Sequence, residues 1–350
     1  MEQNISLYEG YARLKRTRAA FMLALIFGLI LLIGIAVTLG SADLGVAESY
    51  LAILAGLFPG RFSAPELAIT IVWDYRLHRV LFAVCAGFGL AVAGSVMQGI
   101  LRNPLASPFT LGIASAAATG ASVAIVMGAG VLGGEYLIIG NAFLFALLAA
   151  FAIYGMARYR GVGSETMVLA GIALMYLFSA VTSLLQYVGS SEELQAVVFW
   201  MFGSVDKSTW PKLGIVALVL ACTVPYLVYR AWDLNALAEG DEVAAGLGVP
   251  VERSMTVMML IASLITAVII CFTGTIGFIG LVAPHITRMI IGSDFRTLLP
   301  ASGLIGALLL LAADSIARSV LAPQVIPVGI VTAFLGVPFF IYLFLHRRDA

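Results

Sequence analysis

Residues 80–99 read VLFAVCAGFGLAVAGSVMQG, twenty consecutive residues without a charged side chain. An apolar helix of about 20 residues crosses the hydrocarbon core of a bilayer, so this stretch predicts a transmembrane helix. Small residues recur at every fourth position, at Ala83, Gly87, Ala91, Ser95 and Gly99. Such a stripe allows close approach of neighbouring helices, which in lipid attract each other mainly through packing. We therefore expect a helix packed within a bundle, and prefer this to a pore-lining stripe.

Runs of the same kind recur along the whole chain. Hydrophobic residues make up 61% of the 350 residues and charged residues 11%, against about 25% charged in an average globular domain. This composition excludes a soluble or disordered chain and predicts an all-α membrane protein with ten transmembrane helices. The predicted spans are 19–39, 80–99, 109–128, 136–157, 166–188, 212–230, 254–274, 276–292, 299–320 and 326–346. The eighth span begins in glycine-rich sequence, so its helix is expected to start near Pro284, which suits a first turn.

The distribution of basic residues predicts the orientation. If both termini are cytoplasmic, the inner segments hold thirteen of the nineteen Lys and Arg residues, as the positive-inside rule requires. The other six are Arg61, Arg76, Arg79, Lys207, Lys212 and Arg318. We expect a cytoplasmic segment 1–18, one transmembrane domain 19–346 that starts with a retained signal anchor, and a cytoplasmic end 347–350. Its long loops are 40–79 and 189–211 outside and 231–252 inside.

Scarce residue types limit the chemistry of the chain. None of the three lysines follows a glycine, so a GxxxxGK[ST] phosphate-binding loop is impossible. Any ATP must therefore be hydrolysed on another chain. The three cysteines and three histidines lack the spacing of a metal site. No catalytic residue, no metal ligand and no cofactor is predicted on this chain, and the equal numbers of acidic and basic residues do not favour nucleic acid as a partner.

Five sequence segments together point to one family. They are Arg76–Arg79 (RLHR), Gln98–Pro108 (QGILRNPLASP), Leu237–Val249 (LAEGDEVAAGLGV), Gly277–His285 (GFIGLVAPH) and Ile326–Thr332 (IPVGIVT). In this order and spacing they closely resemble the FecCD-type permeases, the membrane subunits of type II ABC importers for iron siderophores, haem and cobalamin. The resemblance extends from about residue 20 to the C-terminus.

The resemblance implies a multi-pass permease of a bacterial or archaeal cytoplasmic membrane that is not itself an enzyme. It implies the type II ABC importer permease fold, a homodimer, two cytoplasmic ATPase subunits that bind ATP and Mg, and an extracytoplasmic substrate-binding protein. Import would proceed by alternating access. A ferric siderophore is the expected substrate, because that branch of the family is the largest. Haem, cobalamin and molybdate-type oxyanions remain alternatives.

The inner loop 231–252 combines acidic residues with small and apolar ones. Gly246 and Gly248 are expected to end a helix there. A solvated turn is the simpler interpretation, but apolar side chains such as Val243 would then face water. The resemblance identifies the loop with the coupling helices that seat on the ATPase. The coupling residues it implies are Leu237, Glu239, Asp241, Glu242, Val243, Leu247 and Gly248.

Two further sets of residues are assigned through the resemblance. Arg76, Arg79 and Arg318, which could simply anchor at the interface, would pair with carboxylates of the binding protein in bidentate geometry. The pathway and its inner gate would include Asn103, Leu105, Ser164, Glu165 and Trp200. Glu165 departs from the family, where this position is small and neutral, and an alternative is that it pairs with Arg158 or Arg160. The outer segment around Trp200 is expected to form a short helix.

Asp314 and His285 are the titratable residues that invite other interpretations. A carboxylate at membrane depth is costly and commonly functional, but Arg318 follows four residues later as a partner. We expect Asp314 to be structural rather than a proton relay, and His285 to be a hydrogen-bonded structural residue at a buried turn. An ion-coupled secondary transporter would need Asp314 for coupling. An intramembrane hydrolase would need a nucleophile opposite His285, and the sequence shows no signature for one.

Overall fold

The computed structural model describes residues 2–345 apart from residues 41, 43, 161 and 162. Its elements are helices joined by short links. They are α1 (Glu2–Thr38), α2 (Val46–Leu57), α3 (Glu66–Ile71), the π-helix η1 (Val72–Leu77), α4 (His78–Ile100), α5 (Ile113–Met127), the 3-10 turn η2 (Gly134–Tyr136), α6 (Leu137–Arg160), α7 (Ser164–Val188), α8 (Ser191–Met201), α9 (Trp210–Tyr229), α10 (Ala231–Ala238), α11 (Asp241–Gly246), α12 (Val251–Thr273), α13 (Ile279–Ile291), α14 (Phe295–Ser319) and α15 (Val328–Leu345). The predicted end 347–350 lies outside the described residues.

Seven helical stretches in the described part of the chain are long and apolar enough to cross a membrane. They are Lys15–Thr38, Glu66–Ile100, Gly134–Tyr159, Ser164–Val188, Trp210–Tyr229, Val251–Thr273 and Phe295–Ser319. The three remaining predicted spans, 109–128, 276–292 and 326–346, fall on the shorter apolar helices α5, α13 and α15. The all-helical class is confirmed, and the count of ten crossings stays a prediction.

The predicted outer loop 40–79 is largely helical. It contains α2, and from Glu66 the helices α3, η1 and α4 follow one another without a break. No glycine or proline occurs between Pro65, the residue that precedes α3, and the start of α4, so no breaker ends the helix there. Arg76 and Arg79 therefore lie on a continuous helical stretch.

The helix of the eighth span begins earlier than predicted. It starts at Ile279, so Pro284 lies within the helix instead of in its first turn. Proline cannot donate a hydrogen bond to the carbonyl four residues earlier, here that of Gly280. That carbonyl faces α4, where a Cβ atom on Gly94 would lie 1.8 Å from the Gly280 oxygen. The backbones of α4 and α13 therefore meet directly, which only glycine at position 94 allows.

The predicted packing stripe of α4 is confirmed. All five of its residues are buried, and α4 packs chiefly against α12, α13 and α14. A Cβ atom on Gly87 would lie 2.3 Å from the backbone oxygen of Gly306 in α14, and one on Gly99 would lie 2.7 Å from the ring of Phe295. The small residues thus serve helix packing rather than a pore.

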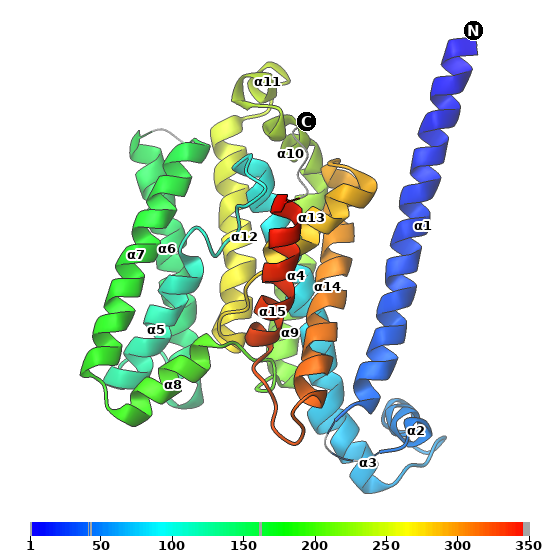
Figure 1. Ribbon diagram of the computed structural model, residues 1–350, viewed down its shortest axis with the longest axis vertical. Coiled ribbons are helices and arrows are strands. Elements are labelled where there is room, and N and C mark those ends of the chain that lie inside the picture. Colours follow the sequence, from blue (N-terminus) through cyan, green and yellow to red (C-terminus); the bar gives the residue numbers. More distant parts are fainter. Residues whose placement is uncertain (1, 41, 43, 161–162, 346–350) are drawn as a thin grey trace.

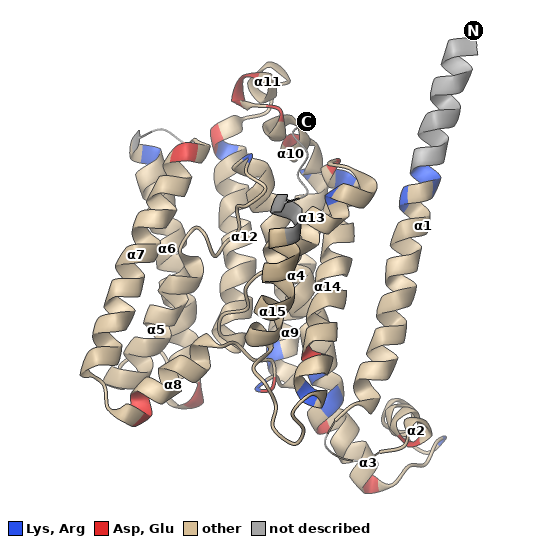
Figure 2. Cartoon of the chain, viewed as in Figure 1, with Lys and Arg blue, Asp and Glu red and all other residues tan. Residues whose placement is uncertain are grey.

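Charge and topology separate the molecule into two ends (Figures 1 and 2). The start of α1 and the end of α15 point to the end where α10 and α11 lie, and α2, α3 and α8 lie at the opposite end. Figure 2 shows the charged residues gathered at these two ends, with a nearly uncharged band between them. This arrangement is that of a bundle across a bilayer. We call the α10–α11 end the inner end, following the predicted orientation.

Candidate functional site

The predicted coupling loop folds into α10 and α11. Helix α11 ends in a Schellman motif: Gly248 donates to the Ala245 carbonyl and Val249 to the Ala244 carbonyl, both at 2.9 Å. Gly248 has φ +82°, the left-handed conformation that favours glycine after a helix. The expected ending of the helix at Gly246 and Gly248 is therefore confirmed.

Helix α11 presents apolar and acidic side chains outward. Val243 is 48% and Leu247 70% exposed, while Ala244 packs inward with no exposed surface. Glu239 and Glu242 are also exposed. Leu237, which was predicted with them as a coupling residue, is buried in the core of the bundle. Leu237 lies on the side of α10 that faces the bundle. It therefore packs the coupling loop against the subunit and offers no contact to a partner.

The predicted inner-gate residues lie where the α4–α5 loop meets the start of α7. The Asn103 side chain accepts a hydrogen bond from the Leu105 amide at 2.9 Å, and Leu105 is 47% exposed. Ser164 and Glu165 form the first turn of α7, and Glu165 is exposed. Arg158 donates to the hydroxyl of Tyr154 in its own helix, and the side chain of Arg160 lies outside the described residues.

Arg102 connects this gate region to the coupling segment. Its guanidinium lies 3.1 Å from the carboxylate of Asp241 at the start of α11. The same nitrogen lies 3.5 Å from the Ser164 hydroxyl. Residues assigned separately to coupling and to the gate are therefore joined by one side chain. The sequence motif contained Arg102, but nothing in its spacing indicated a partner 139 residues away.

Trp200 lies apart from the other predicted gate residues. It belongs to α8, the expected short outer helix, which begins with a capping box between Ser190 and Glu193. This helix lies at the outer end of the molecule (Figure 1). The Trp200 carbonyl approaches Gly274, where a Cβ atom would lie 2.1 Å from its oxygen. Trp200 therefore lies at the outer end, as the resemblance implies, and its part in a pathway stays a prediction.

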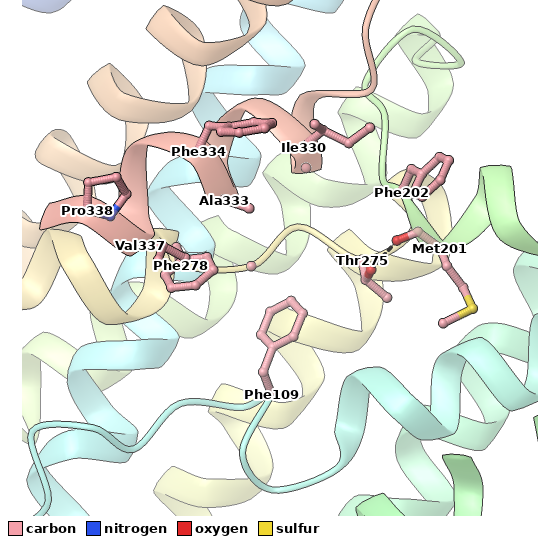
Figure 3. Close-up of a pocket in the computed structure, with 12 residues that line it drawn as sticks. Phe109, Met201, Phe202, Thr275, Phe278, Ile330, Ala333, Phe334, Val337 and Pro338 are labelled. Atoms are coloured by element: carbon pink, nitrogen blue, oxygen red, sulfur yellow. Dashed lines mark hydrogen bonds between the residues drawn. The ribbon is translucent and has the colours of Figure 1, made fainter. Parts of the chain in front are cut away.

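A cavity of about 660 Å³ opens beside α15. Figure 3 shows its wall built from the end of α8, the link before α13, the α4–α5 loop and α15. The lining is apolar and rich in aromatic rings, including Phe109, Phe202, Phe278 and Phe334. The hydroxyl group of Thr275, which also lines the cavity, donates a hydrogen bond to the Met201 carbonyl. The cavity therefore offers mainly apolar contacts.

Phe278 is the unusual residue of this wall. Its φ is +66°, a left-handed value that is a clear outlier for a bulky residue. The residue also lines a second cavity of about 180 Å³ between α13, α14 and α15. Its ring packs on Gly336, where a Cβ atom would lie 2.5 Å from the ring. The sequence motif Gly277–His285 contains Phe278, but it gives no signal of the left-handed backbone at this residue.

Of the arginines predicted to contact a binding protein, Arg76 and Arg318 are buried within the subunit, and the Arg79 side chain is 11% exposed. Arg76, on η1, donates to the carbonyls of Val37, Thr38 and Ala42. Arg318 donates to the carbonyls of Ala36 and Leu39. The two arginines thus satisfy the free carbonyls at the end of α1, where a positive charge is also favoured by the helix dipole.

Asp314 lies between the other charges at this end. Its carboxylate has no exposed surface and is 2.8 Å from the Arg79 guanidinium and 3.0 Å from that of Arg318. The predicted pairing with Arg318 is confirmed, and the second arginine favours a structural role over proton relay. The predicted contacts of Arg76, Arg79 and Arg318 with a binding protein require exposed guanidinium groups, and the structure instead directs these groups inward. His285 lies half-buried within α13, not at a turn as predicted.

Comparison with known proteins identifies the chain. The model of the FecCD transport family matches residues 28–346. The chain belongs to the FecCD transport family. This FecCD permease is 47% identical over 284 residues to an ABC transporter permease protein of Methanocaldococcus jannaschii, covering 79% of this chain and 81% of the relative. It is 39% identical to the cobalamin import permease BtuC of Halobacterium salinarum, covering 83% and 77%.

A solved structure agrees with the fold of the FecCD permease. It is a metal-chelate type ABC transporter in an inward-facing conformation, with TM-score 0.82 and 30% identity over 93% of this chain and 99% of that chain. Other relatives are named as permeases for hemin, siderophore and molybdate. The chain is therefore a permease subunit of an ABC importer and is not itself an enzyme.

Proposed function

We propose that this FecCD permease imports a metal chelate, first of all a ferric siderophore, across a cytoplasmic membrane by alternating access. The observation that carries the proposal is the exposed face of α11. Its apolar side chains, Val243 and Leu247, stand beside the carboxylate of Glu242 at the inner end of the bundle. A short, firmly capped helix with such a face suits the surface of a separate ATPase, because exposed apolar side chains are stabilised when a partner covers them.

Two copies of the chain, two ATPase subunits that bind ATP and Mg, and one outer binding protein would form the working importer. Ten transmembrane crossings with both termini inside fit the arrangement of the two ends. For the binding protein we propose a surface built from α2, α3 and the links between them, whose position Arg76, Arg79 and Arg318 stabilise from beneath. The three arginines would then affect docking indirectly, by fixing the position of this surface, and would not contact the binding protein themselves.

The apolar cavity supports a bulky chelate as cargo. Aromatic and aliphatic walls contact the organic body of a siderophore, haem or cobalamin without binding it strongly, and weak contact favours release. The relatives named for cobalamin, hemin and siderophore support the same class. A molybdate-type oxyanion is the alternative, since one relative is named for molybdate.

The test is co-purification from the native membrane followed by transport assays in proteoliposomes. We expect an ATPase and a binding protein to accompany the chain, and uptake of a ferric hydroxamate to require ATP. Haem, cyanocobalamin and molybdate are offered in parallel. Glu242→Arg should release or uncouple the ATPase, whereas Arg158→Ala, at the same end with its described hydrogen bond inside α6, should not. Uptake that persists without an ATPase and collapses with the proton gradient would refute the proposal in favour of a secondary transporter.

A further inference from the structure

The end of α4 carries a strained arginine. After the last helical residue, the Arg102 amide donates to the Gly99 carbonyl at 3.3 Å and the Asn103 amide to the Gln98 carbonyl at 3.2 Å. This is the hydrogen-bond pattern of a Schellman motif, in which the position of Arg102 is usually glycine. Arg102 has φ +48°, a left-handed conformation that is unfavourable for an L-residue with a Cβ atom.

The same chain shows how an unstrained ending is made. Helix α11 ends in the same motif, and there the left-handed position is Gly248. Strained positions persist where the surrounding structure requires the side chain, and they often mark functional sites. At the end of α4 the backbone conformation would favour glycine, so we attribute the presence of arginine at position 102 to the contacts of its side chain.

The Arg102 side chain reaches two elements that have different predicted roles. Its guanidinium is 3.1 Å from Asp241 in α11 and 3.5 Å from Ser164 at the start of α7. It also lies over the link between α10 and α11, where Gly240 has φ +123° and a Cβ atom would lie 3.7 Å from an Arg102 nitrogen. The Arg102 side chain therefore lies beside the glycine that links α10 to α11.

Stability alone does not account for the pair. The side chains of Arg102 and Asp241 are 30% and 41% exposed, and an exposed ion pair adds little to stability. Helix α10, by contrast, is held firmly, with Leu234 and Leu237 in the core and Asn235 bonded to Asp294. Helix α11 is therefore joined to α10 through Gly240 and to the predicted gate through Arg102.

We propose that Arg102 transmits movement of the coupling helix α11 to the inner gate, as a positioning residue that exchanges its contacts between Asp241 and Ser164. The inference rests on the proposed coupling to an ATPase. Couplings between sites typically change an equilibrium about 5- to 150-fold. We expect an effect near the lower end, because both partners are partly exposed to water.

The experiment uses the assembled importer and reads the gate directly. Leu105→Cys, in a chain where the exposed Cys222 is replaced by serine, is labelled with an impermeant maleimide before and after trapping with ATP and vanadate. In the parent chain we expect nucleotide to change the labelling rate at least about fivefold. Arg102→Gly should remove that change while the melting temperature and the bound ATPase are retained, because glycine relieves the backbone strain.

Rescue variants separate transmission from a structural role. Arg102→Lys should keep part of the response. Asp241→Arg should lose it, and the Arg102→Asp, Asp241→Arg double variant should regain it, since the pair is restored with its charges exchanged. The matched control is Arg158→Ala. A full nucleotide response in Arg102→Gly, or no recovery in the double variant, would overturn the inference. So would an unresponsive parent chain with its ATPase bound, whereas a parent chain without an ATPase would refute the proposed function itself.

Discussion

Arg79 and Asp314 lie 235 residues apart in sequence and form a bidentate ion pair at the outer end of the bundle, with a shortest distance of 2.8 Å. Arg318 supplies a second guanidinium to the same buried carboxylate. The pair joins α4 to α14 at a depth where water does not compensate a free charge.

Replacing Asp314 with Asn should therefore destabilise the subunit strongly. Removing one partner from a buried ion pair leaves an uncompensated charge, which costs roughly 3–5 kcal/mol. Thermal unfolding in detergent should show a large drop for Asp314→Asn and almost none for Glu192→Gln, an exposed acidic residue at the same end. An unchanged melting temperature together with lost uptake would instead return Asp314 to a proton-relay role.

Gly94→Ala should disrupt the contact between α4 and α13. The added methyl group would lie 1.8 Å from the Gly280 oxygen, a backbone atom that cannot rotate away. Overpacking of this kind costs typically 1–3 kcal/mol and occasionally more. Gly155→Ala in α6 is the matched control, because nothing lies within 4 Å of its added Cβ atom. Melting temperatures of the two variants should differ clearly, and equal values would contradict the direct backbone contact.

Gly336→Ala should displace Phe278 from its strained position and change the cavity. The added Cβ atom would lie 2.5 Å from the Phe278 ring, so the ring must move into one of the two cavities that it borders. We expect slower uptake in proteoliposomes with normal binding of the ATPase. Gly214→Ala in α9, which has open space, should behave as the parent chain. Normal transport in Gly336→Ala would show that the position of Phe278 does not limit passage.

Asp294 should contribute stability that depends on pH. The Arg296 guanidinium beside it holds the pKa of this carboxyl well below its usual range, and Asn235 adds a further hydrogen bond. A lowered carboxyl pKa stabilises the folded state above the ordinary pKa of about 3.9, and this stabilisation is lost as the pH falls through the folded pKa. Arg18 of α1 also pairs with Asp294 at 3.2 Å.

Asp294→Asn should therefore lower the melting temperature at neutral pH, and the difference from the parent chain should shrink on acidification. Unfolding curves in detergent between about pH 3 and pH 7 measure this, a range chosen to extend below the ordinary carboxyl pKa. Glu165→Gln, an exposed carboxylate at the inner end, serves as the control with little effect at either pH. A difference that is constant across the range would contradict the lowered pKa.

Much of the architecture follows from local sequence. An uncharged run such as 80–99 must be helical in lipid, because every backbone polar group then finds its partner within the run. The same locality made the glycine ending of α11 and the packing stripe of α4 predictable, whereas the short outer helix was expected from the family resemblance. Where proline or glycine interrupts a run, as at Gly274–Pro284, local signals placed the helix start wrongly. The helix continues through Pro284 while the Gly280 carbonyl packs closely against Gly94 of α4, a contact that local sequence does not reveal.

The contacts of the charged side chains were decided by the packed bundle. The sequence predicts that Arg76, Arg79 and Arg318 contact a binding protein. In the structure their guanidinium groups instead contact the carbonyls at the end of α1 and the carboxylate of Asp314. The sequence predicts Leu237 as a contact with the ATPase, and the orientation of α10 instead places it in the core. Arg102 acquires its importance only when α4, α7 and α11 meet. A charged side chain reaches several ångströms, so its partner depends on which helices become neighbours, and that is settled by packing across the whole chain.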